Sequence, residues 1–415
     1  MNRIKNVRNG IMMGMANYLI AIICPFVIRT IMIYQWGNEY LGLNSLFSSI
    51  LQVLSLSELG FGVAISYLLY EPIASGNKER INVILNFYRF VYRIIGAVIV
   101  MASIVLTFFL PNLVNGSWPN DINIYVLFWI YVVNTVLSYF LFAYKRVLLA
   151  ANQRYDLEMM IAIGISLFKY ILQIVILLLA DNYYLYVIII PLSTALDNLV
   201  CSFVINKKFP GHRPEGKIEK KEIVQILKNT GGAFCAKIGS TVYLSVDSIV
   251  ISSFLGLYIL GTYNNYYYII SMFITLFSVV HNTIRPVIGN YWITEDKQKN
   301  WTMYRMIHIG YMCFVSVISV CCIFLLKKFE VLWGGTTNEL NNNIVFLLVM
   351  CFYIERLTAI PTVYLEATGT LWQGKFVPLI SAIVNLVVNV ILVKKIGLAG
   401  VIISSIASVV FVSLP

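Results

Sequence analysis

Eight ionisable side chains lie inside long apolar stretches of this sequence, where a charge is costly. They are Arg29, Glu58, Lys169, Asp197, Lys237, Asp247, Glu355 and Arg356. A charged side chain at the centre of a membrane helix costs about 2.5–3.5 kcal/mol on insertion scales, so it is retained mainly where it lines a cavity or finds a partner. These residues are therefore the first candidates for binding chemistry.

The depth of each charge in its stretch separates two kinds of role. Lys169, in SLFKYILQIV, is close to the middle of its stretch, which predicts that it lines a cavity. Arg29 is only a few residues from Trp36, so snorkelling to the outer interface is an alternative for it. Glu355 and Arg356 are adjacent near the inner end of their stretch and are predicted to form a local structural pair.

Composition identifies the medium that surrounds these charges. Of the 415 residues, 59% are hydrophobic and 12% are charged, and the mean hydropathy is +0.81. Soluble domains have about 45–50% apolar and about 25% charged residues, so a soluble globular protein is excluded. The net charge of +11 is expected to report orientation in a membrane before it reports a ligand.

The apolar runs predict about twelve membrane-spanning helices, because one crossing takes about 20 mostly apolar residues. The runs fall at 10–34, 41–70, 90–110, 122–144, 159–180, 183–205, 230–256, 258–284, 304–326, 343–362, 376–393 and 398–415. We expect an all-α polytopic membrane protein made of a six-helix lobe (1–205), a cytoplasmic linker (206–229) and a second lobe (230–415) that is truncated in its last helix.

Basic residues predict the orientation of these helices. With the N-terminus in the cytoplasm, the N-terminal tail and even-numbered loops hold 21 of the 30 Lys and Arg residues, and the odd-numbered loops hold four. Positive residues gather in cytoplasmic loops, so this imbalance predicts a cytoplasmic N-terminus. The linker is read as a solvated loop, with contact to lipid headgroups as the alternative.

The two halves of the chain repeat weakly. Gly37, Leu41 and Gly42 follow the first run, and Gly256, Leu260 and Gly261 follow the seventh, at an offset of 219 residues. A six-plus-six repeat has parallel orientation, which is typical of transporter lobes related by an axis along the membrane normal.

Motifs of soluble enzymes and metal sites are weak or missing in the sequence. GTLWQGKF, starting at Gly369, fits GxxxxGK but has Phe376 where a phosphate loop needs Ser or Thr. The three histidines have no clustered spacing, and the seven cysteines lie in apolar runs without a CxxC pair. We expect no enzyme, no catalytic residue and no metal site. The aromatic run 263–273 would form either a sugar-stacking surface or an interfacial tyrosine belt.

Two segments resemble the polysaccharide-biosynthesis flippases, which translocate lipid-linked oligosaccharide repeat units and belong to the MATE-like exporter superfamily. At the N-terminal end the similar pieces are Arg29-Thr30, EYLGLN from Glu39, SELG from Ser57 and YEP from Tyr70. Near the other end they are ATG from Ala367, then Lys375, Pro378, ISA from Ile380, Asn385-Leu386 and KKIGLAG from Lys394.

The resemblance implies a flippase that moves undecaprenyl-pyrophosphate-linked oligosaccharide across the bacterial cytoplasmic membrane by alternating access. A pyrophosphate needs cations in a wet cleft, and the candidates are Arg29, Lys169 and Lys237. No nucleotide-binding element is recognised, so we expect coupling to Na⁺ or H⁺ without another cofactor. Glu58, Asp197 and Asp247 are the candidates for ion coupling or gating.

Further expectations concern partners and a gate. The partners are the lipid-linked oligosaccharide and membrane lipids, with no nucleic acid, and the protein is expected to be a monomer. The repeat offset sets Asp247 opposite Ile28, next to Arg29, which suggests an Arg29–Asp247 contact that closes the outer side. The open alternatives are a drug or cation exporter of the same superfamily, a peptidoglycan-precursor flippase and a membrane scaffold that does not transport.

Overall fold

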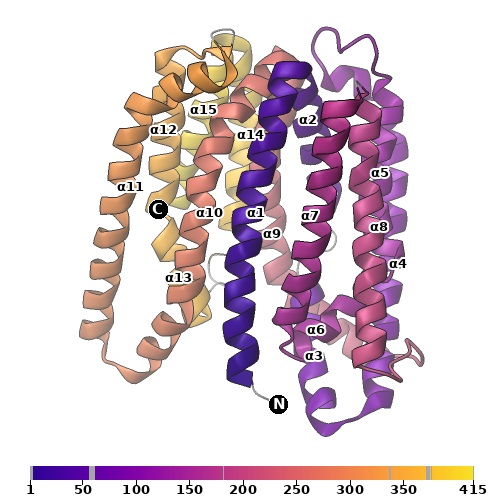
Figure 1. The fold of residues 1–415 in the computed structure, drawn as a ribbon. Helices are drawn as coiled ribbons and strands as arrows, with labels where there is room; N and C mark the ends of the chain where they lie inside the picture. The colour runs from indigo at the N-terminus through magenta and orange to yellow at the C-terminus, as the bar shows by residue number, and fades with distance from the viewer. Residues whose placement is uncertain are drawn as a thin grey trace. The chain divides into compact units, whose positions relative to one another are not determined.

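The computed structural model describes residues 3–55, 61–180, 182–335, 338–370, 374 and 376–414. Regular structure within these residues is helical (Figure 1). The α-helices of the first half are α1 (Arg3–Gln35), α2 (Asn38–Leu54), α3 (Phe61–Ser75), α4 (Lys78–Thr107), α5 (Ile124–Phe140), α6 (Val147–Ala151), α7 (Tyr155–Leu179) and α8 (Tyr183–Lys208). Those of the second half are α9 (Lys220–Leu255), α10 (Leu257–Thr294), α11 (Lys297–Gly334), α12 (Asn342–Leu357), α13 (Ala359–Thr368), α14 (Val377–Ile396) and α15 (Leu398–Ser408).

The predicted all-α polytopic membrane fold is confirmed. Nine described helices are long and apolar enough to cross a membrane, and a tenth span is counted if α5 and the bent 143–151 segment are one. The expected span 41–70 consists of α2 and α3 on either side of 56–60, which lie outside the described residues. The expected span 343–362 is extended to Thr368 by α13.

Short polar side chains and glycines set the ends of these helices. Asn77, Asn123, Asn182, Asp296 and Asn341 each accept a backbone N–H in the first turn of the helix that follows. Such caps satisfy donors that have no partner inside the helix, and each contributes about 1 kcal/mol. The apolar runs therefore become helices with defined starting points.

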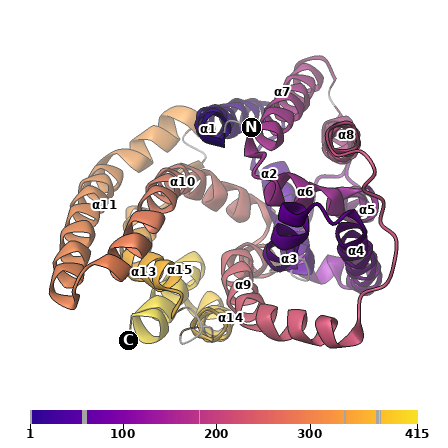
Figure 2. The same ribbon diagram turned by 90° about the horizontal axis from the view of Figure 1, so that it is seen from below.

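The chain forms two compact units. Unit 1 contains Met1–Gln35, Ile50–Pro111 and Pro119–Phe234, and unit 2 contains Trp36–Ser49, Asn112–Trp118 and Cys235–Pro415. In unit 1, α1 packs on α7, α7 on α8 and α8 on α5, while α3 packs on α4 and α6. Figure 2 shows α3, α4, α5 and α6 gathered at one end of this unit.

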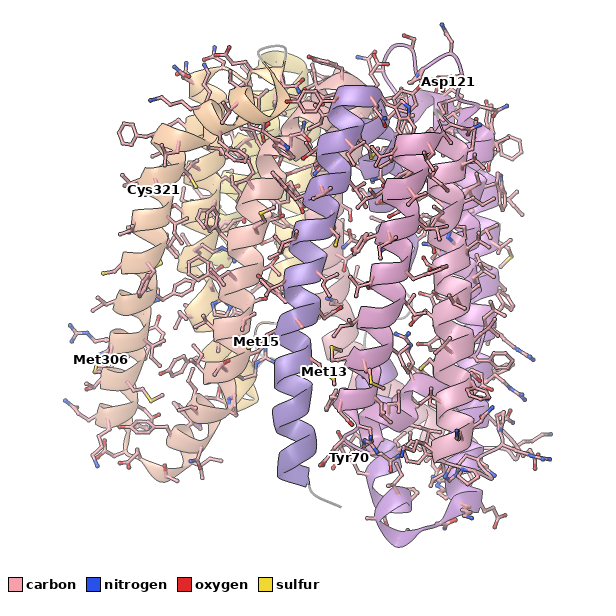
Figure 3. All side chains as sticks on the ribbon, viewed as in Figure 1. Met13, Met15, Tyr70, Asp121, Met306 and Cys321 are labelled. Carbon is pink, nitrogen blue, oxygen red and sulfur yellow. The ribbon has the colours of Figure 1, made fainter. Side chains whose placement is uncertain are left out.

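The buried core of unit 1 is rich in tyrosine and aliphatic residues. It includes Ile84, Leu85 and Tyr88 of α4, Leu148 of α6 and Cys201 of α8. In unit 2, α14 packs on α15, α12 on α11 and α15, and α13 on α10. Figure 3 shows Met306 and Cys321 projecting from the outer side of α11, where apolar side chains suit contact with lipid.

The segment expected to be a linker is part of unit 1 and is anchored to α4. The Arg213 N–H donates to Asn82 Oδ1 at 3.0 Å, and Asn86 Nδ2 donates to the Gly216 carbonyl at 2.7 Å. Arg80 Nη2 donates to both carboxylate oxygens of Glu222, at 2.7 and 2.8 Å. We call residues 209–219 the α4 strap.

The α4 strap also buries a histidine in part. Burial and the neighbouring Lys78 ammonium lower the pKa of the His212 imidazole, which keeps it neutral at pH 7. The strap is therefore fixed to α4 by hydrogen bonds, and the Arg80–Glu222 ion pair holds the start of α9 next to it.

The repeated glycines have matching roles within unit 2. Gly37 and Gly256 both have positive φ, +83° and +91°, at the break before α2 and before α10. A Cβ on Gly42 would overlap the Leu257 carbonyl, and a Cβ on Gly261 would overlap the Asn38 carbonyl. Because Asn38 and Leu257 are also equivalent at the offset of 219, the two contacts are reciprocal, as in a local two-fold.

Buried amides hold this reciprocal contact together. Asn38 Nδ2 donates to Thr262 Oγ1 at 2.9 Å and to Asn338 Oδ1 at 2.5 Å. Asn265 Nδ2 donates back to Asn38 Oδ1 at 3.2 Å. All four side chains are buried, so losing one partner would leave an unpaired polar group.

The close approach predicts an unequal cost for two glycine substitutions. Gly42→Ala should lower unfolding stability by about 1–3 kcal/mol, because the new methyl group meets fixed backbone. Gly164→Ala in α7 is the matched control, since its Cβ would have nothing within 4 Å. Thermal unfolding of both purified variants is the measurement, and an equal melting temperature for the two would contradict the contact.

Candidate functional site

Two of the three predicted cations lie in unit 1, on helices that pack against each other. Lys169 is on α7 and half-buried, with its Nζ 4.3 Å from the centre of the Tyr170 ring. It is also within electrostatic range of Cys24 on α1. Arg29 is on α1, half-buried, and within electrostatic range of Tyr186 on α8. Tyr186 in turn interacts with Tyr170.

The Lys169–Tyr170 contact and these electrostatic interactions define an aromatic-lined cation region on α1, α7 and α8. Tyr186 and its neighbour Tyr183 are buried, with ring centres 5.8 Å apart. Aromatic faces stabilise cations that have lost part of their hydration. The region therefore places Arg29 and Lys169 among aromatic side chains of neighbouring helices.

The remaining predicted sites divide between the units. Lys237 is an exposed residue of α9 in unit 2. Glu58 lies outside the described residues. Because Arg29 belongs to unit 1 and Asp247 to unit 2, their contact stays a prediction.

Asp197 on α8 forms an ion pair with Arg146 in unit 1. The two side chains are 22% and 34% exposed, so the pair is partly desolvated. They line a cavity of about 440 Å³ together with Tyr88, Tyr92, Glu158 and Asn198, among others. We call this space the Asp197 cavity. Its wall combines charged, amide and aromatic side chains.

Asp247 on α9 forms the polar centre of unit 2. Its carboxylate accepts hydrogen bonds from Asn389 Nδ2 at 2.7 Å and from Ser405 Oγ at 3.0 Å. Asn385 Nδ2 donates to Ser405 Oγ at 2.9 Å. The partners described for this half-buried carboxylate are therefore neutral donors from α14 and α15.

Asp247 and a second carboxylate, that of Glu355, line one small cavity of about 50 Å³, which we call the Asp247 cavity. Glu355 Oε1 accepts from the Tyr243 hydroxyl at 2.8 Å, and its other oxygen lies 3.5 Å from Arg356 Nη2. Tyr263 and Tyr267 of the aromatic run stack in the wall of this cavity, with ring centres 5.9 Å apart. Tyr263 and Tyr266 are buried, so this part of the run is interior packing and not an interfacial belt.

Two amides in the hydrogen-bond network of Asp247 have an oxygen without a partner. Asn385 Oδ1 and Asn389 Oδ1 are buried without a hydrogen-bond partner among the described residues. Among all the residues that the structure describes, no group of three or more His, Cys, Asp or Glu side chains could hold a metal. A cation at Asp247 would therefore be held largely by amide and hydroxyl oxygens, the ligands that hard cations prefer.

The sequence matches the family described as polysaccharide biosynthesis protein over residues 6–292. The chain belongs to this family. No curated protein matches it.

Solved structures show that this polysaccharide-family protein has a MATE-like fold. An inward-facing multidrug resistance MATE family transporter of the MOP superfamily is 15% identical, with a TM-score of 0.69 over 99% of this chain and 96% of the other. The lipid II flippase MurJ in an inward closed conformation is 19% identical, with a TM-score of 0.70 over 97% and 86%. A MOP superfamily transporter from Pyrococcus furiosus, whose structure is described by a reverse polarity of its binding pocket, is 13% identical, with a TM-score of 0.63 over 98% and 93%.

The sequence did not indicate the partners of Asp197 and Asp247, the two half-buried acids of this family member. Arg146 falls in the predicted loop between the runs 122–144 and 159–180, whereas the structure pairs it with Asp197, which is 51 positions away. The sequence pattern predicts no role for Asn389 or Ser405, although Asn385 and Asn389 lie one helical turn apart and so share a face. Paired amides at that spacing in an apolar run are a signal that could have found them.

The Arg146–Asp197 pair predicts non-additive losses of stability. Arg146→Leu alone and Asp197→Leu alone should each cost about 1–3 kcal/mol, because each leaves a partly buried charge without its partner. The double variant should cost less than the sum of the two. A double-mutant cycle on thermal unfolding measures this coupling, and simple additivity would show that the pair contributes nothing.

Proposed function

We propose that this protein is a flippase that moves undecaprenyl-pyrophosphate-linked oligosaccharide from the inner to the outer leaflet of a bacterial cytoplasmic membrane. Membership of the polysaccharide biosynthesis family and the MATE-like transporter fold support the class. The observation that carries the substrate proposal is the placement of Arg29 and Lys169 on α1 and α7, half-buried beside tyrosines of unit 1. Lys237 is the third proposed cation.

Pyrophosphate chemistry fits these cations. An anion that leaves water needs charged donors, because an unpaired charge in an apolar medium is far more costly than a paired one. Arg and Lys donate charge-assisted hydrogen bonds to phosphate oxygens, about twice as strong as neutral ones. The polyprenyl chain can stay in the bilayer during the crossing, since only the polar head needs protein.

The acidic cavity of unit 2 bears on the drug-exporter alternative. Drug-sized ligands occupy pockets of about 300–1,000 Å³. The Asp247 cavity has about 50 Å³, which is room for a few waters or an ion, since one water needs about 10–15 Å³. Its size favours a coupling ion over an exported organic cation.

We therefore propose Asp247 as the coupling site for Na⁺ or H⁺. Either a bound Na⁺ or a proton would neutralise the half-buried carboxylate, and Asn385 Oδ1 and Asn389 Oδ1 on α14 are amide oxygens that have no other partner among the described residues. The charge of Asp197 is already balanced by Arg146, which makes Asp197 the weaker coupling candidate. Glu58 remains a candidate from the sequence alone.

The orientation is proposed from charge. In unit 1, the α4 strap lies at the start of α4, and Figure 3 shows Tyr70 near that end and Asp121 at the opposite end. The strap and its flanks are rich in Lys and Arg, whereas residues 108–123 contain none. The strap end is accordingly proposed to face the cytoplasm, with the N-terminus.

Cysteine labelling in intact cells tests this orientation. In a background without native cysteines, Lys217→Cys should resist a membrane-impermeant maleimide until the membrane is opened, whereas Asn115→Cys should react from outside. External labelling at position 217 would invert the proposed topology.

Removing the central lysine tests the pyrophosphate proposal. Lys169→Ala should lower export of the lipid-linked oligosaccharide at least tenfold at an unchanged protein level, because a hydrogen bond to a charged group contributes about 1.5–3 kcal/mol. Lys169→Arg should keep part of the activity. Lys299→Ala, which removes an exposed lysine at the start of α11, is the control. Normal surface polysaccharide with Lys169→Ala would refute the role.

Ion-dependent stability tests the coupling site. A ligand at 100 times its Kd raises the free energy of unfolding by about 2.7 kcal/mol. The melting temperature should therefore rise when sodium replaces choline in the buffer. It should also rise when a choline buffer is made mildly acidic. Asp247→Asn should abolish that rise and Asp197→Asn should keep it. The same rise in Asp247→Asn would exclude Asp247 as the site.

A further inference from the structure

The Asp197 cavity contains polar groups that the pyrophosphate and coupling proposals do not use. Asp197 Oδ1, Arg146 Nε and Asn198 Nδ2 are buried without a hydrogen-bond partner among the described residues. Asn198 is 4% exposed. All three residues line the Asp197 cavity, and an unpaired buried polar group costs about 1–3 kcal/mol.

The charges in the cavity select against an anion. Arg146 is already paired with Asp197, and Glu158 adds a further carboxylate to the wall. A phosphate here would meet an acidic surplus instead of free cations. The fitting ligand is therefore neutral and rich in groups that both donate and accept hydrogen bonds.

The other lining groups narrow this ligand to a carbohydrate. Ser66, Ser138 and Thr194 bring hydroxyls, and Tyr88 and Tyr92 form an edge-on pair with ring centres 4.6 Å apart. Sugar hydroxyls pair with carboxylate, amide and guanidinium groups, while the C–H face of a pyranose packs on aromatic rings. The volume of about 440 Å³ is in the usual range for a small-molecule site, about 300–1,000 Å³.

We propose that the Asp197 cavity is a sugar subsite that binds one or more monosaccharide units of the transported oligosaccharide. The inference rests on the proposed function and deepens it, because it separates sugar recognition from pyrophosphate recognition. The cavity is built by α3–α8 and the 143–146 turn, and neither Arg29 nor Lys169 is in its wall. The two kinds of recognition can therefore be lost independently.

Two variants test the subsite in different ways. Asn198→Leu removes an unpaired donor, and Ala150→Leu fills the cavity without removing any polar group. Ala102→Leu, at a half-buried alanine of α4 outside the cavity, is the matched control for added volume. Thermal unfolding of each purified protein in nanodiscs identifies variants that are folded.

The probes are the free oligosaccharide, released by mild acid from the lipid carrier of the source cells, and undecaprenyl pyrophosphate without sugar. We expect Asn198→Leu and Ala150→Leu to bind the oligosaccharide at least tenfold more weakly and undecaprenyl pyrophosphate as well as the wild type does. Lys169→Ala should show the reverse pattern, and Ala102→Leu should bind both probes normally.

Three results would overturn the subsite. Unchanged oligosaccharide binding by a folded Ala150→Leu or Asn198→Leu variant would exclude it directly. If the wild type bound undecaprenyl pyrophosphate but did not bind the free oligosaccharide, the cavity would hold only water. The flippase proposal would then still stand. Wild-type binding of neither probe would refute both the flippase proposal and the subsite.

Discussion

Every buried charge in this membrane protein must be neutralised or hydrogen-bonded, since an uncompensated ion in an apolar medium is prohibitively costly. The two units meet this constraint in different ways. In unit 1, Asp197 is paired with the Arg146 guanidinium, and the Lys169 ammonium lies over the Tyr170 ring. Unit 2 surrounds Asp247 with amide and hydroxyl donors that carry no charge.

This difference divides the chemistry of the protein. A carboxylate held only by neutral donors can gain a proton or a sodium ion, because binding relieves its desolvation. A carboxylate already paired with Arg146 gains less from a cation and remains available to hydroxyl groups of a neutral ligand. The substrate is thus proposed to be recognised mainly in unit 1 and the coupling ion in unit 2.

The helical class, most of the spans and the repeated glycines could be predicted from the sequence, because each depends on a local run or a short spacing. Gly37 and Gly256 show the value of such a spacing, since both adopt positive φ at equivalent helix breaks. The partners of Asp197 and Asp247 could not be predicted in this way. Arg146, Asn389 and Ser405 reach them through helix packing, across 51, 142 and 158 residues. The aromatic run at 263–273 was ambiguous because its periodicity does not say which helices cover it.

The most direct test of the account is flipping by the wild-type protein alone, reconstituted in liposomes with fluorescent undecaprenyl-pyrophosphate-linked oligosaccharide. The measurement is the fraction of sugar on one face of the liposome that an impermeant reagent, periodate or a lectin, can reach, followed over time. The account predicts that this fraction changes faster than in liposomes without protein, and faster still when a sodium or proton gradient is imposed. Equal rates in protein-containing and empty liposomes, with or without a gradient, would contradict it.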